Sequence, residues 1–149
     1  MIRVSLRFFA SRVLKTKRMD ASDRQTLERV IFSDGVRSRV EAEVLLQLAR
    51  AVQPADPAWN DFVVASIVDF AVWGTRPTGY VHADMAQWLI AILSEGGKTA
   101  LTRRIARAIV AEAHVVDARL AAFARPWWRP DLSWMTWTGA LEQRTWAPA

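Results

Sequence analysis

The sequence predicts an all-α protein, a compact bundle of about five or six helices. Apolar residues recur at spacings of three and four along most of the chain, the period of a helix with one buried face. Several of these runs follow Ser, Thr or Asp at positions that cap a helix N-terminus. No asparagine–glycine turn lies between alternating apolar residues, as a β-hairpin would have.

The first segment, residues 1–18, is basic and amphipathic. Ile2, Leu6, Phe9 and Val13 form one apolar stripe at helical spacing. The segment holds six basic residues and no acid, and the whole chain has a net charge of +5, so the excess positive charge lies here. Three interpretations stay open: a helix on an anionic membrane surface, an ordinary first helix packed on the domain, or a segment that precedes a true start at Met19. The residues expected to contact a membrane or partner are Arg3, Arg7, Phe8, Phe9 and Arg12.

Two capping patterns follow in the next part of the chain. Ser22 and Gln25 match a capping box, which predicts a helix with Leu27, Val30 and Ile31 facing inward. Ser38 and Glu41 match a second box, in which the serine accepts a backbone N–H and the glutamate reaches back to the cap. The apolar stripe expected on this second helix consists of Val40, Val44, Leu45, Leu48 and Val52.

The remaining helices are predicted by the same signals. Asp56 caps a helix that runs through residues 57–73, with Pro57 at the first helical position. Its inward residues are Trp59, Val63, Ile67 and Phe70. The next helix, residues 82–93, starts at His82 and turns inward Met85, Trp88, Leu89 and Ile92. Thr99 caps the last part, residues 100–124, which forms one long or two short helices.

An internal repeat is suggested when residues 34–48 are placed over residues 78–92. Gly35 then meets Gly79, and Leu45 meets Leu89. Each copy follows an apolar helix, so the chain is expected to hold two related helix–loop–helix units.

The segment around Gly35 has some features of a calcium loop. With Gly35 at loop position 6, Asp34 and Glu41 fall at ligand positions 5 and 12. Val30 and Phe32 fall at positions 1 and 3, where neither can bind a cation. No metal or other cofactor is therefore predicted, and Asp34 and Glu41 remain the candidate ligands. The chain has no cysteine and two histidines, and no catalytic residue is predicted.

The stretch "DGVRSRVEAEVL", which contains Asp34, Gly35, Ser38 and Glu41, resembles the turn and helix of TerB-like (tellurite-resistance type) domains. Residues 56–59, "DPAW", and the "GYV…WL" segment from Gly79 to Leu89 also resemble a group of bacterial helical proteins. The resemblance spans roughly residues 22–95 and implies an all-α bundle. It also implies a stress-response role in which acidic residues hold a metal.

The C-terminal segment, residues 125–149, has a different character from the helical domain at residues 19–124. It holds five of the eight tryptophans, broken by prolines. Tryptophan combines a large apolar ring with one donor, which suits either a cover over the bundle or a partner-binding segment. The tryptophans expected to make contact are Trp127, Trp128, Trp134 and Trp137.

These features favour a non-enzymatic adaptor that binds another protein in the cytoplasm, at the inner face of the membrane. One alternative is a TerB-like stress protein with a metal near Asp34 and Glu41. Another is a nucleic-acid-binding protein that uses residues 1–18 and the cluster of Arg103, Arg104 and Arg107. Nucleic acid is the less favoured partner, because the chain beyond residue 18 is nearly neutral.

Overall fold

The computed structural model describes residues 3–52, 56–95, 97 and 99–125. These residues are mostly helical, which confirms the all-α class. The α-helices are α1 (Val4–Thr16), α2 (Ala21–Thr26), α3 (Arg39–Ala51), α4 (Pro57–Val68), α5 (Ala83–Ser94), α6 (Ala100–Glu112) and α7 (Ala118–Ala124). Residues 100–124 form two helices and not one, because the short strand β2 (Val115–Val116) divides them.

Two short π-helical segments and one small sheet complete the fold. α2 continues into η1 (Leu27–Ile31), and α4 continues into η2 (Asp69–Trp73). The strand β1 (Tyr80–Val81) pairs in parallel with β2. This pairing was not predicted, because two residues are too few to show a strand pattern.

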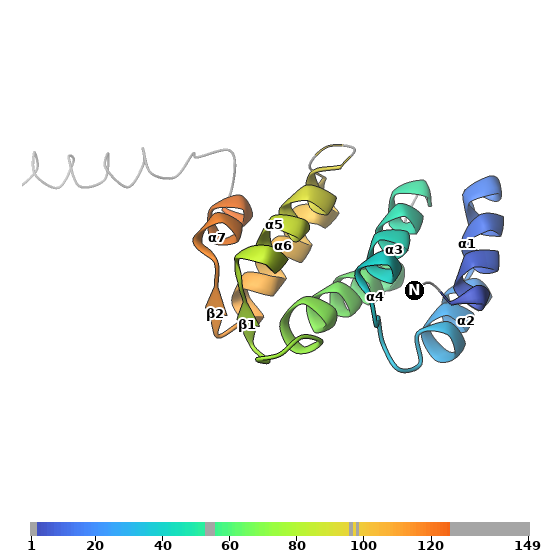
Figure 1. Cartoon of the computed structure of the whole chain (residues 1–149). Coiled ribbons are helices and arrows are strands. Elements are labelled where there is room, and N and C mark those ends of the chain that lie inside the picture. Colours follow the sequence, from blue (N-terminus) through green and yellow to red (C-terminus); the bar gives the residue numbers. More distant parts are fainter. Residues whose placement is uncertain (1–2, 53–55, 96, 98, 126–149) are drawn as a thin grey trace, which may run out of the picture.

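The helices lie side by side in nearly the order of the chain (Figure 1). α1 and α2 are at one end, α3 and α4 are in the middle, and α5, α6 and α7 are at the other end. α1 packs on α3, α3 on α4, and α4 on α6, while α7 packs on both α5 and α6. One continuous apolar core runs from Leu6 in α1 to Ala124 in α7, with buried residues from every α-helix except α2.

Most predicted inward residues are buried, and the four of α4 and η2 are all buried as expected. The predicted inward position of Val30 was wrong, because Val30 is 67% exposed, whereas Leu27 and Ile31 are buried. It lies in η1, whose wider π turn departs from the ordinary helical period used to predict it. The predicted inward position of Val40 was also wrong, because Val40 is 46% exposed. The buried face of α3 is centred on its neighbours Glu41 and Ala42.

Three predicted helix caps are confirmed. Ser38 accepts the Glu41 N–H at 3.2 Å, Asp56 accepts the Ala58 N–H at 3.2 Å, and Thr99 forms a capping box with Thr102. The predicted cap at Ser22 was wrong, because Ser22 lies inside α2 and Asp20 is the N-cap.

The reason is that an earlier acidic pair provides a better start for α2. The Asp20 carboxylate accepts the Asp23 N–H at 2.7 Å, and the Asp23 carboxylate accepts the Asp20 N–H at 3.4 Å. An aspartate is as good a cap as a serine, so the helix begins at the first suitable residue.

The two predicted helix–loop–helix units share their backbone geometry. Gly35 has φ +80° and Gly79 has φ +82°, both in the left-handed region that glycine adopts without strain. The next helix begins at Arg39 in one unit and at Ala83 in the other, four residues after the glycine in both cases. Each glycine also follows a π-helical segment, η1 or η2.

Candidate functional site

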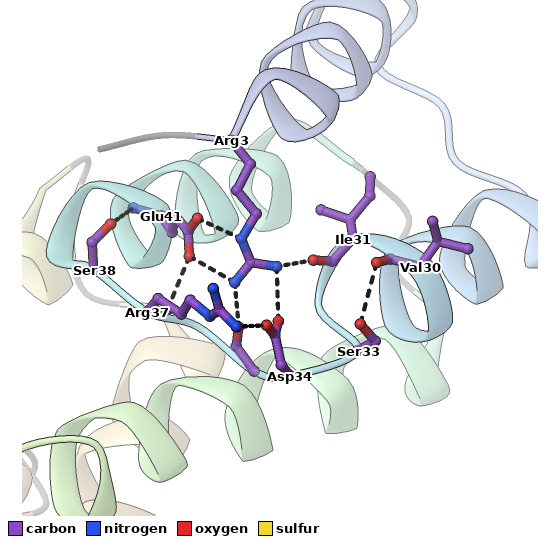
Figure 2. A network of polar contacts seen from close by, with 9 residues as sticks. Arg3, Val30, Ile31, Ser33, Asp34, Arg37, Ser38 and Glu41 are labelled. Carbon is purple, nitrogen blue, oxygen red and sulfur yellow. Dashed lines mark hydrogen bonds and ion pairs between the residues drawn. The ribbon is translucent and has the colours of Figure 1, made fainter.

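The candidate metal ligands Asp34 and Glu41 surround the side chain of Arg3, which enters from the start of α1 (Figure 2). Arg3 Nε lies 2.9 Å from Glu41 Oε1, and Arg3 Nη1 lies 3.0 Å from Asp34 Oδ1. The same guanidinium donates to two backbone carbonyls, those of Ile31 and Gly35. The group that occupies the centre of this loop is therefore the chain's own cation.

The second carboxylate oxygen of Glu41 is also in use. It accepts the Arg37 N–H at 2.9 Å and lies 3.4 Å from Arg3 Nη2. Sequence reasoning expected Glu41 to reach back to the Ser38 cap, and that detail was wrong. The carboxylate bonds instead to the N–H of the residue before the cap, since it is drawn toward the guanidinium of Arg3.

This Arg3 cluster, defined as Arg3, Asp34, Arg37 and Glu41, is a structural ion network. Glu41 is only 1% exposed, so its charge depends on Arg3 for compensation. Arg3 also lies over the ring of Phe32, at 5.6 Å from the centroid, which fixes the start of α1 to the loop. A metal would have to displace the guanidinium to reach these oxygens. Within the described ranges, no group of three or more His, Cys, Asp or Glu side chains is placed to hold one.

The membrane-contact residues predicted in α1 lie on two different sides of the helix. Phe9 is 8% exposed and belongs to the core, and Arg3 belongs to the cluster described above, so neither faces outward. Those two assignments were wrong, because the face of α1 that carries them packs against α3 and the loop. Arg12 is more exposed, but it pairs with Asp23 at 2.5 Å and lies over the Phe9 ring.

The outer face of α1 is formed by the other predicted contacts and their neighbours. Phe8 is 71% exposed and Val4 is 67% exposed, and both stand on a helix without a single carboxylate. Four exposed cations stand on α1 or just after it, namely Arg7, Lys15, Lys17 and Arg18. None of these four makes an ion pair with any residue that the structure describes.

The arginines of α6 lie at the other end of the molecule from α1 (Figure 1). Arg104 pairs with Asp61 of α4 at 2.6 Å, and Arg103 Nε donates to the Thr99 carbonyl at 3.4 Å. Arg107 is exposed and forms no ion pair within the described residues. Among the described residues, the three side chains and Ala100 line an open hollow of about 350 Å³.

Sequence reasoning missed a groove between α4 and α6. Its volume is about 390 Å³, and Val64 and Val68 contribute to its apolar wall. Asp61, Asp69 and Glu112 add negative charge, which Arg104 offsets in part through its pair with Asp61. Trp73 at the end of η2 is 38% exposed. The only hint in the sequence was a tryptophan at the end of an apolar run, followed directly by Gly74. The four predicted tryptophans of the C-terminal segment lie outside the described residues.

Comparison of the chain with protein-family models, curated proteins and solved structures found no match. The resemblance to TerB-like domains therefore stays a prediction. Among the residues that the structure describes, no helix is long and apolar enough to cross a membrane.

Proposed function

We propose that this protein is a non-enzymatic adaptor that docks on an anionic membrane surface through the outer face of α1. The observation that carries the proposal is that α1 and the two residues after it expose four cations without an ion pair to any described residue, on the helix that also exposes Phe8. Arg7 and Lys15 are exposed on α1 together with Phe8, Lys17 and Arg18 are exposed directly after it, and α1 itself has no acid.

The rest of the molecule supports a specific role for these charges. Elsewhere, most described arginines are paired with a carboxylate, as Arg39 is with Asp84 and Arg50 is with Glu95. The surplus positive potential is thus concentrated at one end of the bundle. Each basic residue near an anionic lipid surface contributes about 1 kcal/mol, so four of them give weak, reversible and salt-sensitive binding.

The way α1 is held defines the kind of contact. Its main apolar stripe is buried against α3, and Arg3 fixes its first turn, so α1 stays part of the bundle. Among the described residues of α1, Val4 and Phe8 are the most exposed large apolar side chains, and Leu14 is exposed to a smaller degree. The expected contact is therefore mainly electrostatic, with one or two apolar side chains inserted, and not the burial of a whole helix face.

The groove between α4 and α6 supports the adaptor part of the proposal. Its apolar wall, half-exposed Trp73 and acidic residues suit a basic, apolar segment of a protein partner. It lies on helices other than α1, so a membrane and a protein could be bound at the same time.

Co-sedimentation of the full chain with vesicles tests the membrane contact. We expect binding to vesicles that contain phosphatidylserine, none to pure phosphatidylcholine, and release by salt. The double variant Arg7→Glu/Phe8→Ser should bind at least about tenfold more weakly, because each lost basic charge removes about 1 kcal/mol.

The matched control is Arg29→Glu/Val30→Ser. It removes an exposed arginine and a 67% exposed valine from η1, which makes the same change of chemistry at another surface. Equal loss of binding in both double variants would show that only net charge matters and would refute a site on α1. Binding of the wild type that salt does not weaken would contradict the electrostatic contact.

A further inference from the structure

We infer that the groove between α4 and α6 binds the outer face of α1 from a second copy of this chain. The inference rests on the adaptor part of the proposed function, because it names the occupant of that groove. Two properties of the described surfaces carry it. Their charges are opposite, and the apolar and charged residues on the two surfaces follow one another at similar spacing.

The α4 side of the groove is apolar in the middle and acidic at both ends. Val64 and Val68 are four positions apart, so they lie one above the other along the helix. Asp61 precedes them and Asp69 follows them, and these two acids are about 12 Å apart along the helix axis. Asp61 already pairs with Arg104 of α6 at 2.6 Å, so the negative charge is stronger at the Asp69 end.

The Asp69 end of the groove has the groups that bind a basic side chain. Asp69 and Glu112 are exposed and form no ion pair with any residue that the structure describes. They lie at the same end, because Trp73 and His114, which follow them closely in the chain, have ring centroids 5.7 Å apart. Trp73 is half-exposed and lines the groove. Two carboxylates beside an indole ring attract a lysine or arginine side chain.

The outer face of α1 has matching groups. Val4 and Phe8 are four positions apart and Lys15 is seven positions after Phe8, so the three lie along one line of the helix. Phe8 and Lys15 are separated by about 10 Å along the axis. With Phe8 against the apolar wall, Lys15 lies at the acidic end of the groove, and Lys17 and Arg18 add positive charge just beyond. This is the arrangement of a helix that binds in a groove.

The α1 helix of the same molecule cannot fill the groove. It packs on α3 through its buried stripe, Arg3 fixes its first turn, and it lies at the opposite end of the molecule from α6 (Figure 1). Two copies therefore meet through unlike surfaces. Such a contact leaves one α1 and one groove free in each pair, so a copy on a membrane can hold a second copy in its groove.

Sedimentation velocity of the full chain over a range of protein concentrations tests the contact. We expect reversible self-association that salt weakens. The variant Phe8→Ser/Lys15→Glu changes the α1 surface, and Asp69→Asn/Glu112→Lys changes the groove. Each should weaken self-association about tenfold or more, because each removes opposite charges from the contact. All four positions are exposed, so circular dichroism should show an unchanged helix content.

A mixture of the two double variants gives the sharpest test. The first variant keeps an intact groove, and the second keeps an intact α1. A contact between unlike surfaces therefore predicts that the mixture forms one-to-one pairs at a concentration at which each variant alone is monomeric. Absence of such pairs would overturn the inference, because mixing cannot restore a contact between two α1 helices or between two grooves.

The matched control is Asp84→Asn/Glu95→Lys, which makes the same change of charge at two exposed positions of α5 and just after it. It should self-associate as the wild type does. Equal loss in this control and in the groove variant would show that net charge alone drives association, which would refute the groove.

Vesicles separate this contact from the membrane contact of α1. Asp69→Asn/Glu112→Lys should bind phosphatidylserine vesicles at least as well as the wild type, since it leaves α1 unchanged. A wild type that stays monomeric at every concentration would overturn the second copy as the occupant of the groove and leave the membrane contact unaffected. Self-association without vesicle binding would support the groove contact and refute the membrane contact alone.

Discussion

The turns at Gly35 and Gly79 have the same backbone shape but are held in place by different chemistry. The Gly35 turn is closed by charge, because Arg3 from α1 binds Glu41, Asp34 and the Gly35 carbonyl. The Gly79 turn is closed by the backbone, because its carbonyl accepts N–H groups from His114 and Val115, next to the β1–β2 pair. In both cases the closing group comes from a segment outside the helix–loop–helix unit. A repeated turn can thus be completed by whatever the neighbouring chain supplies.

The largest loss of stability is expected when residues 1–18, which supply Arg3 to the Gly35 turn, are deleted. A chain that starts at Met19 lacks Arg3 and also lacks Leu6, Phe9 and Val13, which are buried in the common core. Each such side chain contributes about 1.5–3 kcal/mol on burial, so the sum approaches the about 5–15 kcal/mol that stabilises a whole domain.

We therefore expect the shortened chain to be largely unfolded, as judged by circular dichroism and urea titration of both chains. A cooperative transition at the same urea concentration as the full chain would contradict a structural role for α1. The same result explains why point variants, and not this deletion, are needed to test membrane binding.

Replacing Arg3 alone tests whether its ion pairs hold the Gly35 turn in place. Arg3→Ala leaves Glu41 buried and uncompensated, and breaking a buried pair costs about 3–5 kcal/mol of unfolding free energy. Arg37→Ala, which removes an ion pair from a side chain that is 67% exposed, should cost less than about 1 kcal/mol.

A double variant sharpens this test. Arg3→Met/Glu41→Leu removes both charges and should be more stable than Arg3→Ala, because no buried charge remains without a partner. Urea unfolding of the four proteins measures the differences. Equal losses in Arg3→Ala and Arg37→Ala would show that the cluster is an ordinary surface network.

The two glycines should respond differently to alanine. Gly35→Ala should lower the free energy of unfolding by about 1–2 kcal/mol, because alanine is strained in the left-handed region. No clash adds to this loss, since the nearest described atom to its Cβ would be Asp69 Oδ2 at 3.6 Å. Gly79→Ala should lower the free energy of unfolding by more, because its Cβ would overlap the imidazole of His114.

The double variant Gly79→Ala/His114→Ala should regain the stability that is lost through overlap with His114. It should not regain the stability that is lost through the left-handed backbone. Thermal unfolding of the three variants measures both parts. An unchanged stability after the second substitution would mean that the imidazole does not confine the turn.

The smallest effects are expected at the caps that follow the two turns. Ser38 caps α3 through its side chain, whereas His82 stands at the same place before α5 and makes no such bond. Ser38→Ala should lose about 1 kcal/mol, and His82→Ser should gain about 0.5–1 kcal/mol. Denaturant midpoints measure both, and a loss of stability in His82→Ser would indicate that the Tyr80–His82 ring stacking outweighs a cap.

Local patterns in the sequence predicted the helices, the caps at Ser38 and Asp56, and the turn at Gly35, because each depends on residues a few positions apart. They could not predict the Arg3 cluster, whose partners Arg3 and Glu41 are separated by 38 positions. The same reasoning identified α1 as the candidate contact helix but named both Phe8 and Phe9. Neighbouring residues of a helix point in directions about 100° apart, so the spacing of Leu6 and Phe9 could have assigned Phe9 to the buried side.

The two closing segments also determine when each turn can be completed during synthesis. Arg3 is made long before its turn and is available as soon as Glu41 emerges. The Gly79 turn stays open until His114 and Val115 emerge, near the end of the described chain. Because chains are made from the N-terminus, the Gly35 turn can form its ion pairs early. The Gly79 turn must wait for its backbone hydrogen bonds, and until then the edge of β1 is unpaired. On the ribosome, α5 therefore emerges well before α7, the helix that completes its packing.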